Sequence, residues 1–233
     1  MLVKTRGIVI NYIKYSESSI IVKIYTEELG LQSYIVSGVR SAKAKNKIAL
    51  YQPMTLLELV VYYKKNQHGL FRISEVKCLS PFHSIPFNFI KSGVAIFLTE
   101  MLSKSLKEET PNPELYAFLF KSILLFDQLE EGYENFHLFF LLKLSKYLGF
   151  EPESAGEILG QIEEAKKIII ESETKKMLVE KIGMLIDMDF DTDFKLNHYQ
   201  RSEIIDILLD FYRLHVAGFD QIKSLIVLRE MNK

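Results

Sequence analysis

Cysteine is almost absent from this sequence of 233 residues, which contains only Cys78. A single cysteine can form neither an intramolecular disulfide nor a multi-cysteine zinc site, which fits a reducing compartment. Cys78 follows Val76 in an alternating pattern. We therefore interpret Cys78 as a small buried hydrophobic residue and not as a nucleophile.

Long hydrophobic runs are missing as well. Residues 1–19 contain no apolar stretch of signal-peptide length, and the apolar runs at Leu56–Tyr63 and Leu138–Leu142 are far too short to cross a bilayer. We therefore expect neither export nor membrane insertion, and we predict a cytoplasmic protein.

Common catalytic motifs do not occur. The sequence lacks a Gly-x-x-x-x-Gly-Lys-Ser/Thr phosphate loop, a His-Glu-x-x-His helix and a Gly-x-Ser-x-Gly elbow. Its five histidines are too scattered to indicate a metal site: His68, His83, His137, His198 and His215. His137 and His215 fall in apolar helical faces, so we expect core or interface histidines, each with a satisfied ring nitrogen. We predict a protein that is not an enzyme and that uses no metal or cofactor.

One acidic run resembles the start of a calcium loop, because Asp187–Asp193 has a carboxylate at every second position. The resemblance then fails, since Thr192 stands where the loop needs glycine and His198 where a bidentate Glu would complete the ligands. We predict a solvated acidic loop between two helices. A metal site, including that of a metal-dependent phosphoesterase, and a contact with a basic partner remain as alternatives.

The charge that is present is unevenly distributed. Residues 1–80 contain 12 basic and 5 acidic residues, a net charge of +7, whereas the remaining 17 basic and 25 acidic residues give −8. Because the basic residues are interleaved with short strand-like runs, a nucleic-acid backbone is the anion that we expect this part to bind.

Short antiparallel strands are expected in this basic part, because polar and apolar residues alternate between turn signals. A long basic loop between the third and fourth strands fits a small closed barrel of the oligonucleotide-binding (OB) type, and an open sheet with a covering element is the competing interpretation. The five strands are predicted at Arg6–Lys14, Ser19–Thr26, Leu31–Ser37, Met54–Tyr63 and Leu70–Lys77.

Helical periodicity replaces this pattern after Ser80-Pro81. The predicted fold class is α+β, with an OB-type barrel in residues 1–80 and an all-α domain in residues 81–233. The almost wholly apolar segment Asn135–Leu144 should lie at the centre of the helical domain. Helices are predicted at Phe87–Lys107, Asn112–Glu131, Tyr133–Leu148, Ser172–Ile186, Tyr199–Ala217 and Asp220–Glu230.

The basic loop Gly38–Lys47 sets four cations within eight residues, a pattern typical of sequence-independent phosphate binding, although a merely solvated loop is the alternative. The predicted DNA-binding residues are Arg6, Lys14, Lys23, Arg40, Lys43, Lys45, Lys47, Lys64, Lys65 and Arg72. Nearby aromatic residues could stack on unpaired bases, but we expect most to be core, and Tyr62 and Tyr63 to point to opposite faces. These aromatic residues are Tyr12, Tyr15, Tyr25, Tyr34, Tyr51, Tyr62, Tyr63 and Phe71.

Several motifs in this order resemble the bacterial recombination mediator family RecO over essentially the whole chain. In the barrel they are Gly7-Ile8-Val9, Tyr15-Ser16-Glu17-Ser18, Tyr25–Gly30, Ser37–Arg40 and Leu50–Pro53, and in the helical part Phe97–Leu102, Leu148–Pro152 and Lys223–Leu225. The resemblance implies a protein without enzymatic turnover, associated with the nucleoid, that binds single- and double-stranded DNA and anneals complementary strands. It also implies that the protein acts with RecR to load RecA onto DNA coated by single-stranded DNA-binding protein (SSB). An RNA-binding module is the alternative function.

Two further expectations follow from this resemblance. A groove for the acidic C-terminal tail of SSB would need an apolar surface edged by a cation, for which Arg213 and Lys223 are the candidates. Many family members have a four-cysteine zinc site after the Leu-Gly-Phe/Tyr-x-Pro stretch, whereas Glu153–Leu196 contains no cysteine. We therefore expect no zinc here, and helix packing through apolar residues in its place. These are Ile158, Leu159, Ile162, Met177, Leu178, Ile182 and Leu185.

Overall fold

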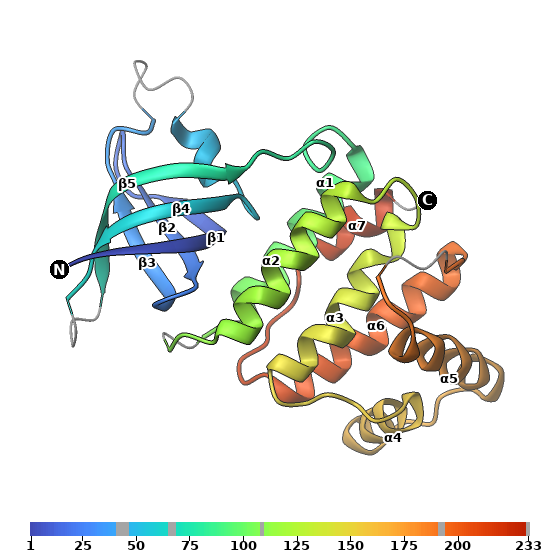
Figure 1. The fold of residues 1–233 in the computed structure, drawn as a ribbon. Coiled ribbons are helices and arrows are strands. Elements are labelled where there is room, and N and C mark those ends of the chain that lie inside the picture. Colours follow the sequence, from blue (N-terminus) through green and yellow to red (C-terminus); the bar gives the residue numbers. More distant parts are fainter. Residues whose placement is uncertain (41–46, 65–68, 108–109, 191–193, 232–233) are drawn as a thin grey trace. The chain divides into compact units, whose positions relative to one another are not determined.

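The computed structural model describes residues 1–40, 47–64, 69–107, 110–190 and 194–231 (Figure 1). The chain forms two compact units, one comprising Met1–Ser84 with Leu98–Leu124 and the other Ile85–Phe97 with Leu125–Lys233. The barrel therefore shares its unit with parts of two helices. The expectation of separate domains in residues 1–80 and 81–233 stays a prediction.

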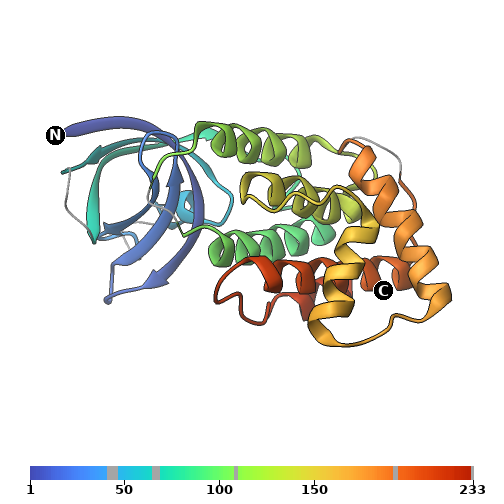
Figure 2. The ribbon, with the colours of Figure 1, turned by 90° about the horizontal axis from the view of Figure 1, so that it is seen from below.

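In the described part of the chain, five strands form a closed barrel in the order β1-β2-β3-β5-β4. Figure 1 labels these strands, and Figure 2 shows the same ribbon from below. Among the strand pairings of the described residues, the short one of β3 with β5 is parallel and the other four are antiparallel. Closure confirms the predicted barrel and excludes the open sheet. The strands are β1 (Leu2–Lys14), β2 (Ile20–Thr26), β3 (Gly30–Val36), β4 (Leu56–Tyr62) and β5 (Leu70–Ser80).

Alternate strand residues fill the barrel, and one glycine allows its walls to come close together. A Cβ atom on Gly7 would lie 2.6 Å from Cγ2 of Ile24 and 2.9 Å from Cδ1 of Leu59, so a larger residue would clash there. Cys78 is only half-buried, which corrects the expectation of a buried residue. In the described residues β5 pairs with β3 only near its start, so Cys78 lies where β5 is bonded to β4 alone.

Seven helices follow in the residues that the structure describes, and they include the six that were predicted. Two 3₁₀ turns, η1 (Lys47–Tyr51) and η2 (Tyr133–Asn135), precede β4 and α3. Among the described residues, no helix has both the length and the apolar character needed to span a membrane. The helices are α1 (Phe89–Ser105), α2 (Pro113–Gln128), α3 (Phe136–Tyr147), α4 (Ala155–Lys166), α5 (Ser172–Asp187), α6 (His198–His215) and α7 (Leu225–Met231).

Helix α3 is buried along most of its length, which confirms its predicted central position, and it packs on α5 and α6. Helix α4 was not predicted as a helix. The side chain of Ser154 caps it by accepting a hydrogen bond from the backbone N–H of Glu157, while the Glu157 carboxylate accepts one from the backbone N–H of Glu153. This Ser-x-x-Glu pattern is a capping-box signal that is visible in the sequence.

Candidate nucleic-acid interface

Seven of the ten predicted DNA-binding cations are exposed in the described part of the barrel unit, and five of these seven have side chains that are not engaged within the protein. No hydrogen bond or ion pair joins the side chains of these five to other described residues, so their charges are available to an anion. The five are Lys14, Lys23, Lys47, Lys64 and Arg72. The predicted contacts at Lys43, Lys45 and Lys65 lie outside the described residues.

Arg6 is engaged within the protein. Its Nε donates a hydrogen bond of 2.7 Å to Oε2 of Glu27, and its Nη2 donates to Oε1 of the same carboxylate. The guanidinium carbon also lies 5.6 Å and 5.3 Å from the ring centroids of Tyr116 and Phe120. The hydrogen bond from Arg6 holds the pKa of Glu27 below its ordinary value. A DNA contact by Arg6 stays a prediction.

Arg40 is engaged in a different way. Its Nη1 donates a hydrogen bond of 2.8 Å to the carbonyl of Ser16, and its backbone N–H donates one of 3.2 Å to the carbonyl of Ser18. Both acceptors lie in the turn between β1 and β2, so Arg40 fixes the start of the basic loop against this turn. Its predicted contact with DNA is untested.

A first hollow opens beside the end of β4 and the start of β5. It has a volume of about 290 Å³ and is lined by Tyr62, Tyr63, Lys64, Leu70, Phe71 and Arg72, among others. Tyr62 is 55% exposed and lies opposite Arg72 in the β4–β5 ladder. Tyr63 instead packs its ring 5.4 Å from that of Phe71, against the barrel core. The two tyrosines therefore face apart, as predicted, and only Tyr62 presents its ring to solvent.

A second hollow of about 450 Å³ adjoins the first and shares Leu70 with it. A row of paired residues crosses its floor, because Lys23 on β2 lies opposite Ser33 on β3, and Ser33 opposite Leu70 on β5. Its residues include Lys23, Leu31, Ser33, Leu70, Leu106 and Lys107. Leu106 and Lys107 follow α1 and belong to the same compact unit as the barrel. Sequence patterns did not predict this hollow, because its two sides are far apart in the chain.

The remaining aromatic candidates divide by burial. Tyr12 is half-buried and Tyr15 is exposed. The expectation that most of the eight rings are core is confirmed, because Tyr12 and Tyr63 pack partly buried against the barrel core and four others are almost wholly buried. These four are Tyr25, Tyr34, Tyr51 and Phe71.

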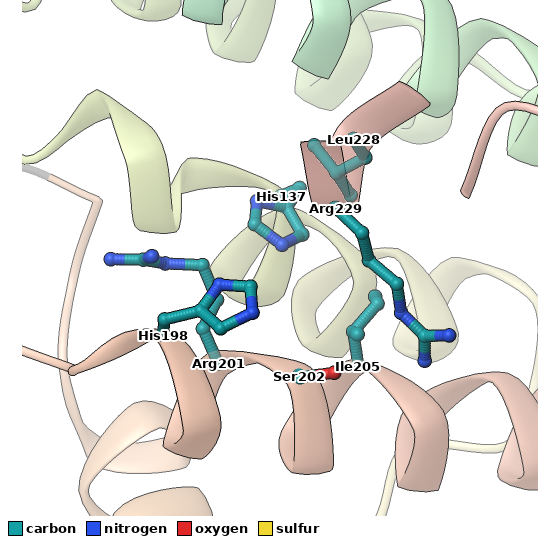
Figure 3. A pocket seen from close by; sticks show the side chains of 7 residues that line it. All are labelled: His137, His198, Arg201, Ser202, Ile205, Leu228 and Arg229. Carbon is teal, nitrogen blue, oxygen red and sulfur yellow. The ribbon is translucent and has the colours of Figure 1, made fainter. Parts of the chain in front are cut away.

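A small cavity lies in the helical unit, and Figure 3 shows His137, His198, Arg201, Ser202, Ile205, Leu228 and Arg229 around it. Its volume is about 10 Å³, room for a single water molecule and not for a substrate. The guanidinium of Arg201 is already bound within the protein, because its Nε donates a hydrogen bond of 2.8 Å to Oδ1 of Asn135. The cavity therefore offers no candidate active site.

The two helical histidines, both expected to be core or interface residues with a hydrogen-bonded ring nitrogen, differ in burial and in hydrogen bonding. His137 is fully buried, and neither ring nitrogen makes a hydrogen bond of ordinary geometry to a described residue, although the backbone of Glu134 interacts with the ring. Its ring packs edge-on against Phe97 at 5.8 Å. Burial, with the nearby charge of Arg201, lowers the pKa of His137 to about 3. His215 is exposed, not core, and its Nε2 lies 2.8 Å from Oε1 of Gln161.

The candidate residues for a partner groove are both exposed. Arg213 donates a hydrogen bond of 2.6 Å to Oδ1 of Asp210, an ion pair one helical turn away. Lys223 lies just before α7. Their roles in partner binding stay predictions.

Metal-ligand residues do not cluster in the described part of the chain, where no group of three His, Cys, Asp or Glu side chains could hold an ion. The end of the acidic run, Asp191 to Asp193, lies outside the described residues. In the segment that lacks the zinc cysteines, five of the seven predicted packing residues are fully buried, and Met177 is half-buried. The five are Ile158, Leu159, Leu178, Ile182 and Leu185, and Ile162 is 1% exposed.

Comparisons with known proteins agree with the fold and with the motifs. Residues 1–82 match the family model "Recombination protein O N terminal", and residues 86–170 match "Recombination protein O C terminal". The DNA repair proteins RecO of Bacteroides fragilis, Flavobacterium johnsoniae and Phocaeicola vulgatus are 38%, 37% and 35% identical to this chain. Each alignment covers 99% of the chain and 99% of the relative. The chain therefore belongs to the recombination protein O (RecO) family of DNA repair proteins.

Proposed function

We propose that this chain is a recombination mediator that binds single- and double-stranded DNA through its barrel and anneals complementary strands. With RecR, it would then help RecA replace SSB on single strands. Membership of the RecO family supports the repair role. The observation that carries the DNA site is the pair of adjoining hollows: Lys64 and Arg72 line the first together with the exposed ring of Tyr62, and Lys23 lines the second.

The physical argument is that the exposed cations bind the phosphate backbone of DNA and do not recognise particular bases. Flexible cations that have no partner can each meet a phosphate, which releases condensed counterions and gives affinity without sequence preference. An exposed aromatic ring adds stacking that any base can satisfy. Both features suit a protein that must handle strands of any sequence, and the exposed charges also attract duplex DNA.

A salt titration tests this site. Fluorescence anisotropy of a labelled oligo(dT) should show tight binding by the native protein that weakens as the salt concentration rises. In the Lys64→Ala/Arg72→Ala variant, the slope of log affinity against log salt concentration should be lower by about 1.4, at about 0.7 per lost phosphate contact. Lys121→Ala is the control, because Lys121 is an exposed cation of the same unit outside both hollows. Absence of salt-sensitive binding by the native protein would reject the proposal. Tighter binding of RNA than of DNA of equal sequence would select the RNA-binding alternative.

Strand annealing and partner binding need separate measurements. We expect the native protein to accelerate pairing of two complementary labelled strands, also when SSB covers them, and to bind RecR. A peptide with the acidic SSB tail should bind near Arg213 and Lys223, where Leu214, Ile226 and Val227 are exposed apolar residues of the same unit. Charge reversal at both cations should abolish peptide binding and leave DNA binding intact.

No chemical turnover is part of this proposal. DNA should remain intact after incubation with the protein and magnesium or manganese. Cleavage that depends on the metal ion would favour the phosphoesterase alternative instead.

A further inference from the structure

The second hollow has the size and composition of a binding pocket for one nucleotide. Its volume of about 450 Å³ lies within the range of small-molecule sites. Three leucines, Leu31, Leu70 and Leu106, supply apolar surface, while Lys23 and Lys107 supply positive charge. None of the described residues that line the hollow is acidic. An anionic ligand with one flat apolar face fits such a lining.

The walls of this hollow are held in place. The floor is a hydrogen-bonded sheet, in which Ser33 pairs with Lys23 on one side and with Leu70 on the other. The opposite wall is the end of α1, where Nδ2 of Asn11 on β1 donates a hydrogen bond of 2.6 Å to Oγ of Ser103. Leu106 is itself 5% exposed and bonded through its backbone N–H to the carbonyl of Leu102. A pocket with such fixed walls loses little conformational entropy when it binds a ligand.

We propose that this hollow binds one unpaired nucleotide of a DNA single strand, with the base against the three leucines and the flanking phosphates at Lys23 and Lys107. The hydroxyl of Ser33, on the floor, can donate to or accept from the base or sugar. The inference rests on the proposed function and deepens it, because it adds a pocket for a single base to a surface that otherwise offers exposed cations and one stacking ring.

Single strands are selected by this arrangement. A base inside the hollow has left its neighbours in the stack and cannot be paired, and extracting it from a duplex costs the free energy of its stacking and pairing. The hollow also shares Leu70 with the first hollow, so a strand can stack one base on Tyr62 and place a nearby base in the second hollow. Presenting separated bases would help a strand to find its complement.

The absence of tryptophan from the chain provides a direct probe. A Leu31→Trp variant places one tryptophan in the wall of the hollow, and its fluorescence should be quenched when oligo(dT) binds. Thymidine monophosphate should quench it weakly, at millimolar concentration, if a free nucleotide also enters. Quenching by the free nucleotide as strong as that by the strand would make the hollow a mononucleotide site and overturn the inference.

Anisotropy of the labelled strand supplies the second measurement, which does not depend on the probe. A Lys23→Ala/Lys107→Ala variant should lower the salt slope by about 1.4, which corresponds to binding roughly 25-fold weaker at 0.1 M salt when affinities are equal at 1 M. The matched control is Lys77→Ala/Lys121→Ala, which removes two exposed cations of the same unit from outside both hollows.

The outcomes separate the inference from the proposed function. Native affinity and slope in the Lys23→Ala/Lys107→Ala variant, with no quenching of the Leu31→Trp probe, would overturn the nucleotide pocket while leaving DNA binding in place. An equal loss in the control variant would also overturn it, because net charge alone would then explain the effect. Failure of the native protein to bind any strand would reject both.

Discussion

Arg6 and Glu27 are joined through two hydrogen bonds between β1 and the residue that follows β2, and this pair ties the barrel to its helical neighbours. Nε of Arg6 lies 2.7 Å from Oε2 of Glu27, and the guanidinium lies over the rings of Tyr116 and Phe120 on α2. A cation held in this way is costly to redirect toward a phosphate. The sequence marks Arg6 as one basic residue among many, whereas its contacts indicate a stabilising role.

Replacing Arg6 should therefore affect stability more than DNA binding. We expect Arg6→Ala to lower the free energy of unfolding by about 1 kcal/mol, through loss of a partly exposed ion pair and its ring contacts. The contribution of the pair requires ionised Glu27, whose pKa is lowered, so it should be complete at neutral pH and disappear on acidification through that lowered pKa. Urea unfolding measures this change, and Lys14→Ala is the exposed control. Unchanged stability with a weaker salt slope would instead place Arg6 on the DNA.

The basic loop gives a second prediction, made from the sequence alone. If Lys43, Lys45 and Lys47 each contact a phosphate, replacing all three by alanine should lower the salt slope for single-stranded DNA by roughly 2, at about 0.7 per contact. Salt-titrated anisotropy measures it. A slope equal to that of the native protein would assign the loop to solubility only, and would leave the two hollows as the DNA site.

Local patterns predicted most of the fold. Alternation placed all five strands, and five strands in about 75 residues with a long basic loop between the third and fourth favoured a small closed barrel, in which no strand edge is left unpaired. Helix α4 was not predicted, although Ser154 and Glu157 form a capping-box pattern. Its buried residues Ala155, Ile158, Leu159 and Ile162 also recur with helical spacing, so the sequence contained both signals for this helix.

Site features that depend on residues far apart in the chain could not be predicted. Whether a cation is exposed or paired depends on its neighbours in space, as Arg6 and Lys64 illustrate. Lys91 is a second example, because it is 1% exposed and its Nζ donates a hydrogen bond of 3.1 Å to the carbonyl of Asp127 at the end of α2. No local pattern distinguishes such a buried lysine from a surface one.

Tyr62 gives a third prediction, specific to single strands. Tyr62→Ala should weaken binding of oligo(dT) by about 1–3 kcal/mol if one base stacks on its ring. Tyr62→Phe should keep native affinity, because stacking needs the ring and not the hydroxyl. Competition experiments should show a smaller effect on duplex DNA, whose bases are already stacked. Tyr15→Ala is the control, because Tyr15 is equally exposed but lines neither hollow. Equal losses in both variants would argue against a specific platform.

His137 gives the last prediction, which concerns pH. Its pKa is about 3 in the folded protein, below the ordinary value of 6.5, because the ring is fully buried and lies near the charge of Arg201. Between these two pH values, His137 binds a proton in the unfolded chain but not in the folded protein. The free energy of unfolding therefore decreases as the pH falls from 6.5. One such proton changes the free energy of unfolding by at most about 1.4 kcal/mol per pH unit.

In His137→Phe the ring contact with Phe97 is retained but no proton can be taken up. Urea unfolding at pH 7, 6 and 5 should therefore show a smaller decrease in the free energy of unfolding than in the native protein. If the free energy of unfolding fell equally with pH in the two proteins, this would mean that His137 also binds a proton in the folded protein, stabilised there by an acceptor.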